Sequence, residues 1–352
     1  MTDKRHQTYH LLLYANIALV MLTILSGLAS FVNPHDFWLF SFLGLIFPVL
    51  ILINIVFIVF WCIKKLRYSL FSLVCLFLFY QQIFNSFAFH LPDDTMEQLH
   101  DFTIMSYNTS NFRHNVKGKT AIIKKRKEAI QFISSDVHPD ILCTQEMSNY
   151  NANLLLKKLN NYYVHRFPHR GTMIFSSFPI IKKGEIDFNT QTNSCLWADI
   201  KIYDDTLRVY SVHLQSNKIS KDANTLINES NKNKDWHKIK TILKNYKKYS
   251  ISRAQQADMI LQHTKRSPYP VLICGDLNDT PQSYTYKTIK NNLQDAFIEK
   301  GIGLGVSFGG AIPGLRIDYI FPHPSIQVLA YHKYKNKFSD HYPIWARLKV
   351  QK

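Results

Sequence analysis

"PVLICGDLNDTPQ" (residues 270–282) is an apolar run that ends in a cluster of polar residues. Its first half has the short, bounded apolar character of a buried strand. Asp276, Asn278 and Asp279 then follow within four positions. Asp, Asn and Pro are also ordinary turn residues. The stretch alone therefore leaves two interpretations open: a strand that runs into a surface turn, or a strand that presents functional side chains at its end.

Other strand-like segments also end, or briefly break, at an acid, an amide or an imidazole. Strand ends on one sheet edge converge in space, so we expect these side chains to line a single cleft. The segments are "FTIMSYN" (102–108), "DILCTQE" (140–146), "LRVYSVHL" (207–214), "LRIDYIF" (315–321) and "SDHYP" (339–343), and their polar residues are Asn108, Glu146, His213, Asp318, Asp340 and His341.

The remaining pattern predicts an α/β fold. Apolar spacing indicates helices over 121–133 and 252–264. Strands are predicted mostly in succession, with few helices between them, which is typical of two packed sheets flanked by helices. The further predicted strands are 172–181, 196–203, a segment around residue 328, and 341–350.

These residue types suit metal-assisted hydrolysis of a phosphoester. Mg²⁺ takes one or two protein carboxylates together with phosphate oxygens, and Glu146 and Asp340 could supply them. Asp276 and Asn278 are two residues apart, so a strand would point both to one side, where they could orient or deprotonate a water. Asp318 lies between apolar residues, where an unpaired charge is costly, and pairing with His341 would explain it.

The segments "MSYN", "TQE", "SVHL", "GDLN", "RIDYIF" and "SDHYP", in this order, resemble the endonuclease/exonuclease/phosphatase (DNase I-like) superfamily over residues 101–350. That superfamily includes pancreatic-type deoxyribonucleases, abasic-site endonucleases, neutral sphingomyelinases and inositol polyphosphate 5-phosphatases. The resemblance implies a four-layer sandwich, with two mixed β-sheets face to face and helices outside.

The resemblance also implies a role for each polar residue at the ion and at the water. Glu146 would be the main metal ligand, with Asn108 and Asp340 near the ion, which would be Mg²⁺, with Mn²⁺ as the alternative. Asp276 would act on the water or the leaving group, and Asn278 would hold the scissile phosphate. Asn108 also begins an "NTS" glycosylation sequon, but its motif position argues against that use.

Two histidines are expected at the phosphate itself. By the same resemblance Asp318 would orient His341, which contacts the phosphate. His213 matches a second substrate-contacting histidine of the deoxyribonuclease and sphingomyelinase branches, where abasic-site endonucleases tend to have tyrosine, although a core histidine is the alternative. Asp279 is better interpreted as a turn residue. For Arg170, Arg253 and Arg316, phosphate contact and structural pairing both remain open.

Composition narrows the partners. Residues 1–100 hold 5 Lys/Arg and 5 Asp/Glu, so the whole formal charge of +17 lies in the remainder. Such a cationic part favours phosphate-bearing partners such as nucleic acid or anionic lipid headgroups. Residues 217–250 hold 9 Lys against 3 acidic residues and indicate a basic insertion, either a solvated excursion or a contact for anionic lipid or a polyanion. The five cysteines have no CxxC or metal-ligand spacing.

Three apolar runs precede this part, and each is long enough to cross a membrane. We therefore expect a membrane anchor over 1–92 and a catalytic domain over 101–352. "GLAS" (27–30) resembles a signal-peptidase site, but the run is long for a signal peptide, so an uncleaved anchor is expected. The uncharged runs, read as transmembrane helices, are 11–32, 37–63 and 68–89.

Lys and Arg bias predicts the orientation. Lys4 and Arg5 precede the first run, and Lys64, Lys65 and Arg67 separate the second from the third, whereas the other connections carry none. Both basic segments should be cytoplasmic. An odd number of spans then places everything after residue 90 outside the cytoplasm, in a multi-pass protein of, we expect, a bacterial inner membrane.

The sequence thus predicts a membrane-anchored, Mg²⁺-dependent phosphoesterase that hydrolyses a phosphodiester or phosphomonoester by attack of water. A phospholipid or lipid-linked phosphate is the favoured substrate, and its partners are that phosphoester and the bilayer. A non-specific extracytoplasmic endonuclease is the first alternative, because cationic charge also binds nucleic acid. A catalytically silent, membrane-tethered binding module is the second. The sequence leaves the oligomeric state open.

Overall fold

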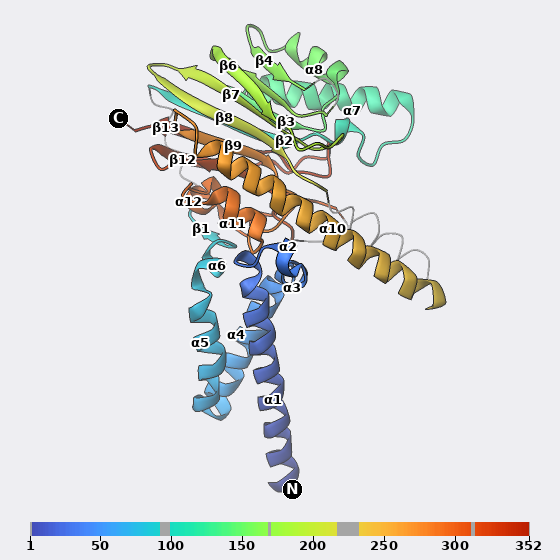
Figure 1. The fold of residues 1–352 in the computed structure, drawn as a ribbon, viewed down its shortest axis with the longest axis vertical. Helices are drawn as coiled ribbons and strands as arrows, with labels where there is room; N and C mark the ends of the chain where they lie inside the picture. The colour runs from blue at the N-terminus through green and yellow to red at the C-terminus, as the bar shows by residue number, and fades with distance from the viewer. Residues whose placement is uncertain (1, 92–98, 168–169, 217–231, 311–313, 352) are drawn as a thin grey trace.

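A computed structural model describes residues 2–91, 99–167, 170–216, 232–310 and 314–351 of the chain. It consists of a sandwich of two β-sheets and a bundle of helices that projects from one side of it (Figure 1). The bundle contains the N-terminus, and the sandwich contains the C-terminus.

Both sheets are mixed. The larger has the order β12-β13-β2-β3-β5-β4 and the smaller β11-β9-β8-β7-β6, and within them only β2 with β3 and β8 with β9 run parallel. The strands of the larger sheet are β2 (Asp101–Asn108), β3 (Ile141–Gln145), β4 (Tyr163–Arg166), β5 (Met173–Ser176), β12 (Ile326–Lys333) and β13 (Ile344–Val350). Those of the smaller are β6 (Ile180–Ile186), β7 (Ser194–Ile202), β8 (Asp205–His213), β9 (Val271–Asp276) and β11 (Asp318–Pro322).

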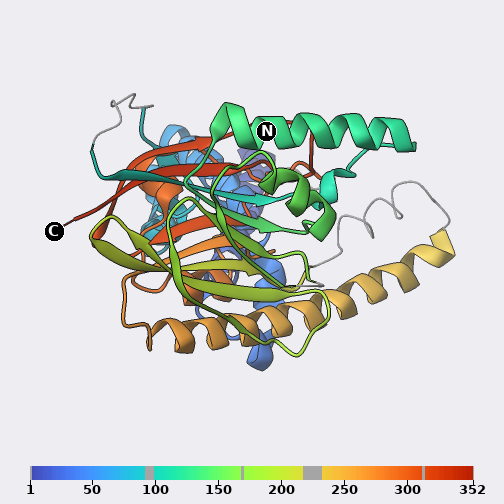
Figure 2. The same cartoon turned by 90° about the horizontal axis from the view of Figure 1, so that it is seen from above.

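The sheets pack face to face, with helices outside. One apolar cluster joins the inner faces of the two sheets, with Ile104 from one and Leu272 from the other among its members. A second cluster fixes α7 (Lys119–Gln131) and α8 (Asn149–Leu156) to the outer face of the larger sheet. A third fixes α10 (Lys232–Thr264) and α11 (Tyr284–Lys290) to the smaller sheet (Figure 2). The predicted layers of helix, sheet, sheet and helix are thereby confirmed.

Within the described residues, two helices rather than the predicted three are long and apolar enough to cross a membrane. They are the apolar part of α1 (Thr2–Gly27), continued by a short 3₁₀ turn to Ser30, and α4 (Phe47–Lys64). The predicted run 37–63 is interrupted before α4, which starts at Phe47 with a proline in its first turn, a favoured place for proline. The run 68–89 is also broken: α5 (Ser69–Leu78) ends where Phe79 leaves helical geometry, and α6 (Tyr80–Phe84) follows.

Buried polar contacts join the bundle helices. The Asn16 side chain donates to Ser72 at 2.8 Å and accepts from the Trp61 indole at 3.1 Å, so it links α1 to α4 and α5. Asn54 donates to Thr23 at 2.8 Å. Such contacts fix helix pairs where hydrophobic burial is weak. The outward faces of the same helices are apolar and exposed, from Leu11 to Phe77.

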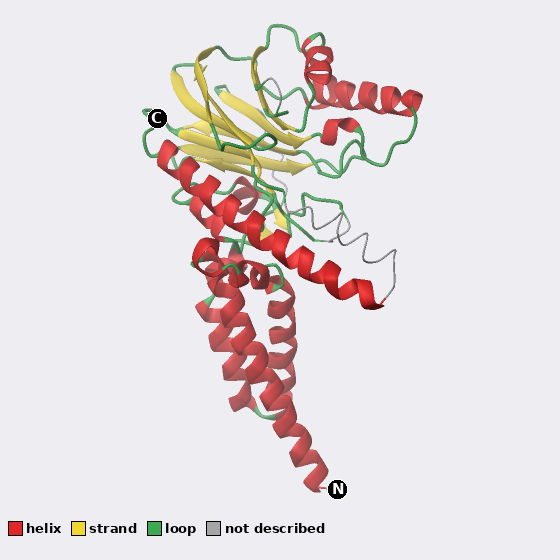
Figure 3. Ribbon diagram, turned by 45° about the vertical axis from the view of Figure 1, so that its right-hand side comes forward, coloured by secondary structure: helices red, strands yellow, loops and turns green. Residues whose placement is uncertain are grey.

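One end of the bundle contacts the sandwich. Short helices α2 (Pro34–Phe37) and α3 (Leu39–Gly44) lie against α10, where Tyr246 donates to the carbonyl of Ser41 at 2.8 Å (Figure 3). Strand β1 (Ala88–Phe89) pairs with β10 (Ile302–Gly303), which follows α12 (Ala296–Lys300). The buried Arg316 guanidinium spans both parts: it donates to Asp295 at 2.7 Å and to the carbonyl of Asn85 at 2.6 Å.

Two predicted segments differ in the structure. The strand predicted over 172–181 is two strands, β5 and β6, which belong to different sheets. Of the predicted basic insertion 217–250, residues 217–231 lie outside the described residues. Its second half is the start of α10, which continues without a break into the helix predicted over 252–264.

Gly275 is required by its position next to Val212. Its φ is +147°, and a Cβ atom there would lie 2.0 Å from the carbonyl oxygen of Val212. We expect Gly275→Ala to lower the free energy of unfolding by more than about 3 kcal/mol, because backbone must move in a packed sheet. Thermal unfolding of the purified protein measures this.

The matched control is Gly118→Ala. Gly118 also has positive φ, +92°, but a Cβ atom there meets nothing within 4 Å. Gly118→Ala should lower the free energy of unfolding only by the conformational penalty of about 1 to 2 kcal/mol for a left-handed backbone. Equal melting temperatures for the two variants would contradict the steric argument.

Candidate active site

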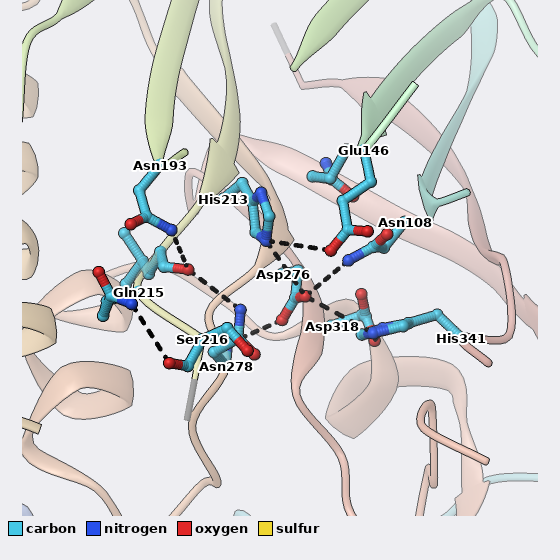
Figure 4. A network of polar contacts seen from close by, with 12 residues as sticks. Asn108, Glu146, Asn193, His213, Gln215, Ser216, Asp276, Asn278, Asp318 and His341 are labelled. Carbon is cyan, nitrogen blue, oxygen red and sulfur yellow. Dashed lines mark hydrogen bonds and ion pairs between the residues drawn. The ribbon is translucent and has the colours of Figure 1, made fainter. Parts of the chain in front are cut away.

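Strand pairing places three of the candidate residues side by side. His213 ends β8 and Asp276 ends β9, and the two are paired across the parallel strands. Asp318 begins β11 and is the antiparallel partner of Asp276. In the facing sheet, Asn108 ends β2 and Glu146 directly follows β3. The expected convergence of strand ends is therefore present in both sheets (Figure 4).

Asp276 is the centre of the group. Its carboxylate is buried, and Oδ2 accepts a hydrogen bond of 2.9 Å from the Asn108 amide of the other sheet. Burial raises the pKa of Asp276 above its usual range. The nearby Asp318 carboxylate also raises this pKa, whereas His341, His213 and the Asn108 hydrogen bond lower it.

His341 and Asp318 form a buried pair. Nδ1 of His341 lies 2.9 Å from Oδ2 of Asp318, and Nε2 lies 3.7 Å from Oδ2 of Asp276. Burial lowers the pKa of His341, but the carboxylates of Asp318 and Asp276 outweigh it and raise the pKa to about 10. His341 is therefore an imidazolium at neutral pH, held in place by Asp318.

His213 faces the same carboxylate from the opposite side. Its Nε2 lies 3.9 Å from Oδ2 of Asp276 and 3.8 Å from Oε1 of Glu146, beyond hydrogen-bond distance. The side chain is buried, and neither ring nitrogen has a hydrogen-bond partner among the described residues. His213 is therefore not a core histidine whose ring nitrogens are hydrogen-bonded by described residues. Nε2 of His213 therefore lies near the carboxylates of both Glu146 and Asp276 without a hydrogen bond to either.

Asn278 does not lie on the strand. β9 ends at Asp276, and Asn278 has a left-handed φ of 52°, so the expectation that strand alternation aligns the two residues is wrong. A turn aligns them instead. The Asn278 backbone N–H donates to Oδ1 of Asp276 at 2.8 Å, and its side chain donates to the carbonyl of Leu214 at 3.1 Å.

The three residues predicted at the metal differ in their surroundings. Glu146 has 48% of its side chain exposed, has φ of 51°, and points toward His213. Asn108 is buried, and its oxygen already accepts from the Ser110 N–H at 3.1 Å, so its observed contacts serve Asp276 and the turn. Asp340 is half-buried, and its Oδ2 lies 3.8 Å from Nδ1 of His114.

A different trio has the closest ligand atoms. One ligand atom each from Asp276, Asp318 and His341 lie within 4.8 Å of one another. Because Nδ1 of His341 is already bonded to Asp318, we interpret this trio primarily as a hydrogen-bonded pair beside a carboxylate.

The structure gives an ion-pair partner to each of the four residues whose roles the sequence left open. Asp279 pairs with the Nε of Arg253 at 3.0 Å, and Arg316 pairs with Asp295, so these arginines have structural partners. The remaining arginine, Arg170, lies 3.2 Å from Asp187.

Sequence reasoning missed two serines that hold the site. The Ser307 hydroxyl accepts from the backbone N–H groups of Ile317 and Asp318, each at 3.0 Å. The Ser339 hydroxyl donates to the carbonyl of Asn108 at 2.8 Å. Ser339 stands within the "SDHYP" motif, so its position could have been noted, whereas Ser307 carries no local signal.

Comparison with known proteins matches this geometry to one family. The model of the "Endonuclease/Exonuclease/phosphatase family" matches residues 105–341, about two thirds of the chain. The chain therefore belongs to the endonuclease/exonuclease/phosphatase family, whose members are hydrolases that act on phosphoesters. A second family model, described as "Domain of unknown function (DUF8431)", matches residues 9–86. No curated protein matches the chain.

Solved structures share the fold of the sandwich. They include an endonuclease/exonuclease/phosphatase from Bacteroides vulgatus (18% identity, TM-score 0.55, covering 71% of this chain and 99% of that one). A humanized D. rerio TDP2 has 17% identity and TM-score 0.53 over 72% and 100%. The mannosyl-6-phosphatase of Bacteroides thetaiotaomicron VPI-5482 has 19% identity and TM-score 0.51 over 70% and 99%. At these identities the likeness shows the fold alone.

The buried Asp276 carboxylate should make the fold less stable than an uncharged side chain would. Asp276→Asn keeps the shape but removes a desolvated charge that lies beside Asp318. When unfolding is measured in the presence of EDTA, we expect the free energy of unfolding of the variant to be higher than that of wild type by about 1 kcal/mol. That corresponds to a melting temperature about 2 to 4 °C higher.

Asp199→Asn is the matched control. Asp199 is equally buried but accepts two hydrogen bonds from Arg208, at 2.6 and 2.8 Å. Its loss leaves a buried guanidinium unpaired and should cost about 3 kcal/mol or more. A melting temperature for Asp276→Asn below that of wild type would contradict the assignment of strain to this carboxylate.

Proposed function

We propose that the chain is a membrane-anchored, divalent-metal-dependent phosphoesterase whose catalytic residues are His213, Asp276, Asn278, Asp318 and His341. One observation carries this proposal. Two buried imidazoles, His213 and His341, face the same oxygen of Asp276 at 3.9 and 3.7 Å, with the Glu146 carboxylate at the rim. This arrangement suits a phosphate held between two nitrogen donors, beside a base for water.

The chain's own residues account for substrate placement and proton transfer. The imidazolium of His341, fixed by Asp318, would donate to a phosphoryl oxygen, and His213 would donate to a second. Asn278 would hold the scissile phosphate from the turn that follows β9. Asp276, held by Asn108, would orient the water and accept its proton. The proton acceptor is buried, so its basicity is higher than that of a surface carboxylate.

The donor set at the rim fits a hard divalent cation. Glu146 offers an accessible carboxylate and Asp340 a second, which is the oxygen chemistry that Mg²⁺ or Mn²⁺ prefers. We propose Glu146, with Asn108 and Asp340, as the residues that would hold it. Enzymes of this family generally depend on divalent metals. When bound, the ion supplies charge neutralisation to the phosphoryl oxygens.

We also propose that residues 1–92 anchor a catalytic domain of residues 101–352 in a membrane. The two long apolar helices are only 22% and 28% buried, so most of their apolar surface has no protein partner. Exposed apolar surface of this extent supports contact with lipid. The N-terminus and the Lys64–Arg67 connection lie at the bundle end away from the sandwich, which supports a cytoplasmic end opposite the catalytic domain.

The position of the site favours a phospholipid or a lipid-linked phosphate as substrate. Four residues after Asn278, the Gln282 side chain donates to Ser86 of the bundle. Arg316, two residues before Asp318, donates to Asn85. Two site segments thus contact the bundle end directly, so the site is close to the proposed membrane surface.

An extracytoplasmic nuclease is the second candidate. The excess positive charge after residue 100 favours it, because phosphate neutralisation dominates non-specific binding to nucleic acid. Among structures of similar fold, one is D. rerio TDP2 complexed with single-strand DNA product. A silent binding module would not require the complete set of acids, amides and histidines.

Hydrolysis of bis-p-nitrophenyl phosphate by the detergent-solubilised full chain tests the activity. We expect turnover that EDTA abolishes and Mg²⁺ restores. Glu146→Gln and His341→Ala should each lower kcat by about a hundredfold or more, as loss of a charge-stabilising or proton-transferring group does. Glu185→Gln, an exposed carboxylate on β6, is the control. Rates unchanged in both site variants would refute the assignment.

The same preparation discriminates the substrates. Hydrolysis of phospholipid vesicles, together with plasmid DNA that stays uncut in a parallel reaction, would support the lipid substrate. Plasmid cleavage that falls steeply as salt rises supports the nuclease.

Thiol labelling tests the orientation. Cys62 is the one exposed cysteine of the five, and the others are buried, so Cys62→Ser gives a silent background. In that background we expect Lys183→Cys on β6 to react with a membrane-impermeant maleimide in intact spheroplasts. Arg67→Cys, at the opposite end of the bundle, should react only after lysis. Labelling of Arg67→Cys in intact spheroplasts would overturn the proposed orientation.

A further inference from the structure

A cavity of about 110 Å³ lies where the bundle meets the sandwich, away from the candidate active site. We call it the junction pocket. None of the eight candidate site residues lines it. On the bundle side it is bordered by the residues after α1 and by α6, and on the sandwich side by Pro281 and by α11 (Figure 1). The lining side chains that the argument uses are Phe31, Gln81, Asn85, Lys287, Lys290 and Asn291.

The junction pocket is cationic. Lys287 and Lys290 line it, one helical turn apart on α11, and none of the lining residues is acidic. Neither ammonium forms an ion pair with a described residue. The Lys287 nitrogen lies 3.4 Å from the centre of the Phe31 ring, and burial lowers the pKa of Lys287. Because two cationic side chains and no acidic one line the cavity, an anion bound there would be stabilised electrostatically.

The other lining groups suit an oxyanion. Gln81, Asn85 and Asn291 also line the cavity, and their side-chain amides carry N–H donors. A volume of about 110 Å³ is a few times the roughly 30 Å³ that one water occupies in the liquid. That is enough for a phosphate group.

The surroundings of the junction pocket identify where the oxyanion comes from. Phe31, Tyr80 and Phe84 lie at or beside it and are 52%, 57% and 56% exposed. Exposed aromatic side chains at the end of apolar helices mark the level of lipid headgroups. Below them, α1 and α5 present exposed apolar side chains, as acyl chains require. A soluble anion would not explain this combination of cations and exposed aromatic rings.

We propose that the junction pocket binds the headgroup phosphate of an anionic phospholipid, with Lys287 and Lys290 as its counter-charges. The inference rests on the proposed membrane anchoring but not on the proposed catalysis. The bound lipid would fix the bundle end against α11. It would be retained rather than hydrolysed, because the catalytic groups lie elsewhere.

The experiment uses the full chain with His341→Ala, so that no lipid is consumed. Purified protein in detergent is titrated with phosphatidylglycerol, and bound lipid is counted by native mass spectrometry. We expect saturable binding, weakened about tenfold or more in Lys287→Gln/Lys290→Gln. Phosphatidylcholine and inorganic phosphate at the same concentrations should not compete. Competition by inorganic phosphate would overturn the lipid assignment in favour of a soluble anion.

The matched control is Lys247→Gln/Lys248→Gln, which removes two exposed lysines of α10 near the same end of the bundle. It should bind lipid as the parent does. If both double variants weakened lipid binding equally, lysines would attract anionic lipid without a specific site. That result would overturn the assignment of lipid binding to the junction pocket. Because the lysines are outside the catalytic set, the same double substitution in an otherwise wild-type chain should leave bis-p-nitrophenyl phosphate turnover unchanged. Failure of hydrolysis and failure of lipid binding are thus separate results.

Discussion

The hydrogen bond from Asn108 to Asp276 is the constraint on which the site depends. This hydrogen bond joins the end of β2 in the larger sheet to the end of β9 in the smaller sheet, and both side chains are buried. A carboxylate in that position is costly unless donors and cations surround it. The hydrogen bonds from Asn108 and from the Asn278 backbone, together with the nearby His341, offset part of that cost. The remaining cost is the one that the Asp276→Asn variant would remove.

The contacts with the bundle extend this constraint beyond the sandwich. Arg316 is buried and divides its hydrogen bonds between Asp295 and the bundle carbonyl of Asn85. Two residues later, Asp318 fixes His341. Without the bundle, the guanidinium would lose an acceptor at a buried position, which is expensive for a charged donor. The helices therefore complete the packing beneath one segment of the candidate site.

Local pattern predicted the strands that carry function better than it predicted the rest. The segments around Asn108, Glu146 and His213 alternate or run apolar up to a polar end, and each became a strand within a residue or two of its expected bounds. The break at Phe79 and the start of α4 depend on how the bundle packs, which hydropathy does not report. The placement of β5 and β6 in different sheets likewise depends on tertiary packing, which the local sequence pattern does not predict.

The failed expectation at Asn278 shows what sequence spacing cannot supply. An alternating strand would have placed Asp276 and Asn278 on one side, but the chain leaves the strand and adopts a left-handed backbone at Asn278. Glu146, at the end of a strand in the other sheet, does the same. Non-glycine residues in this region are strained and persist where the surroundings fix them. Both strained residues face Asp276 or His213, so the strain falls where two strand ends turn their polar groups toward the candidate site.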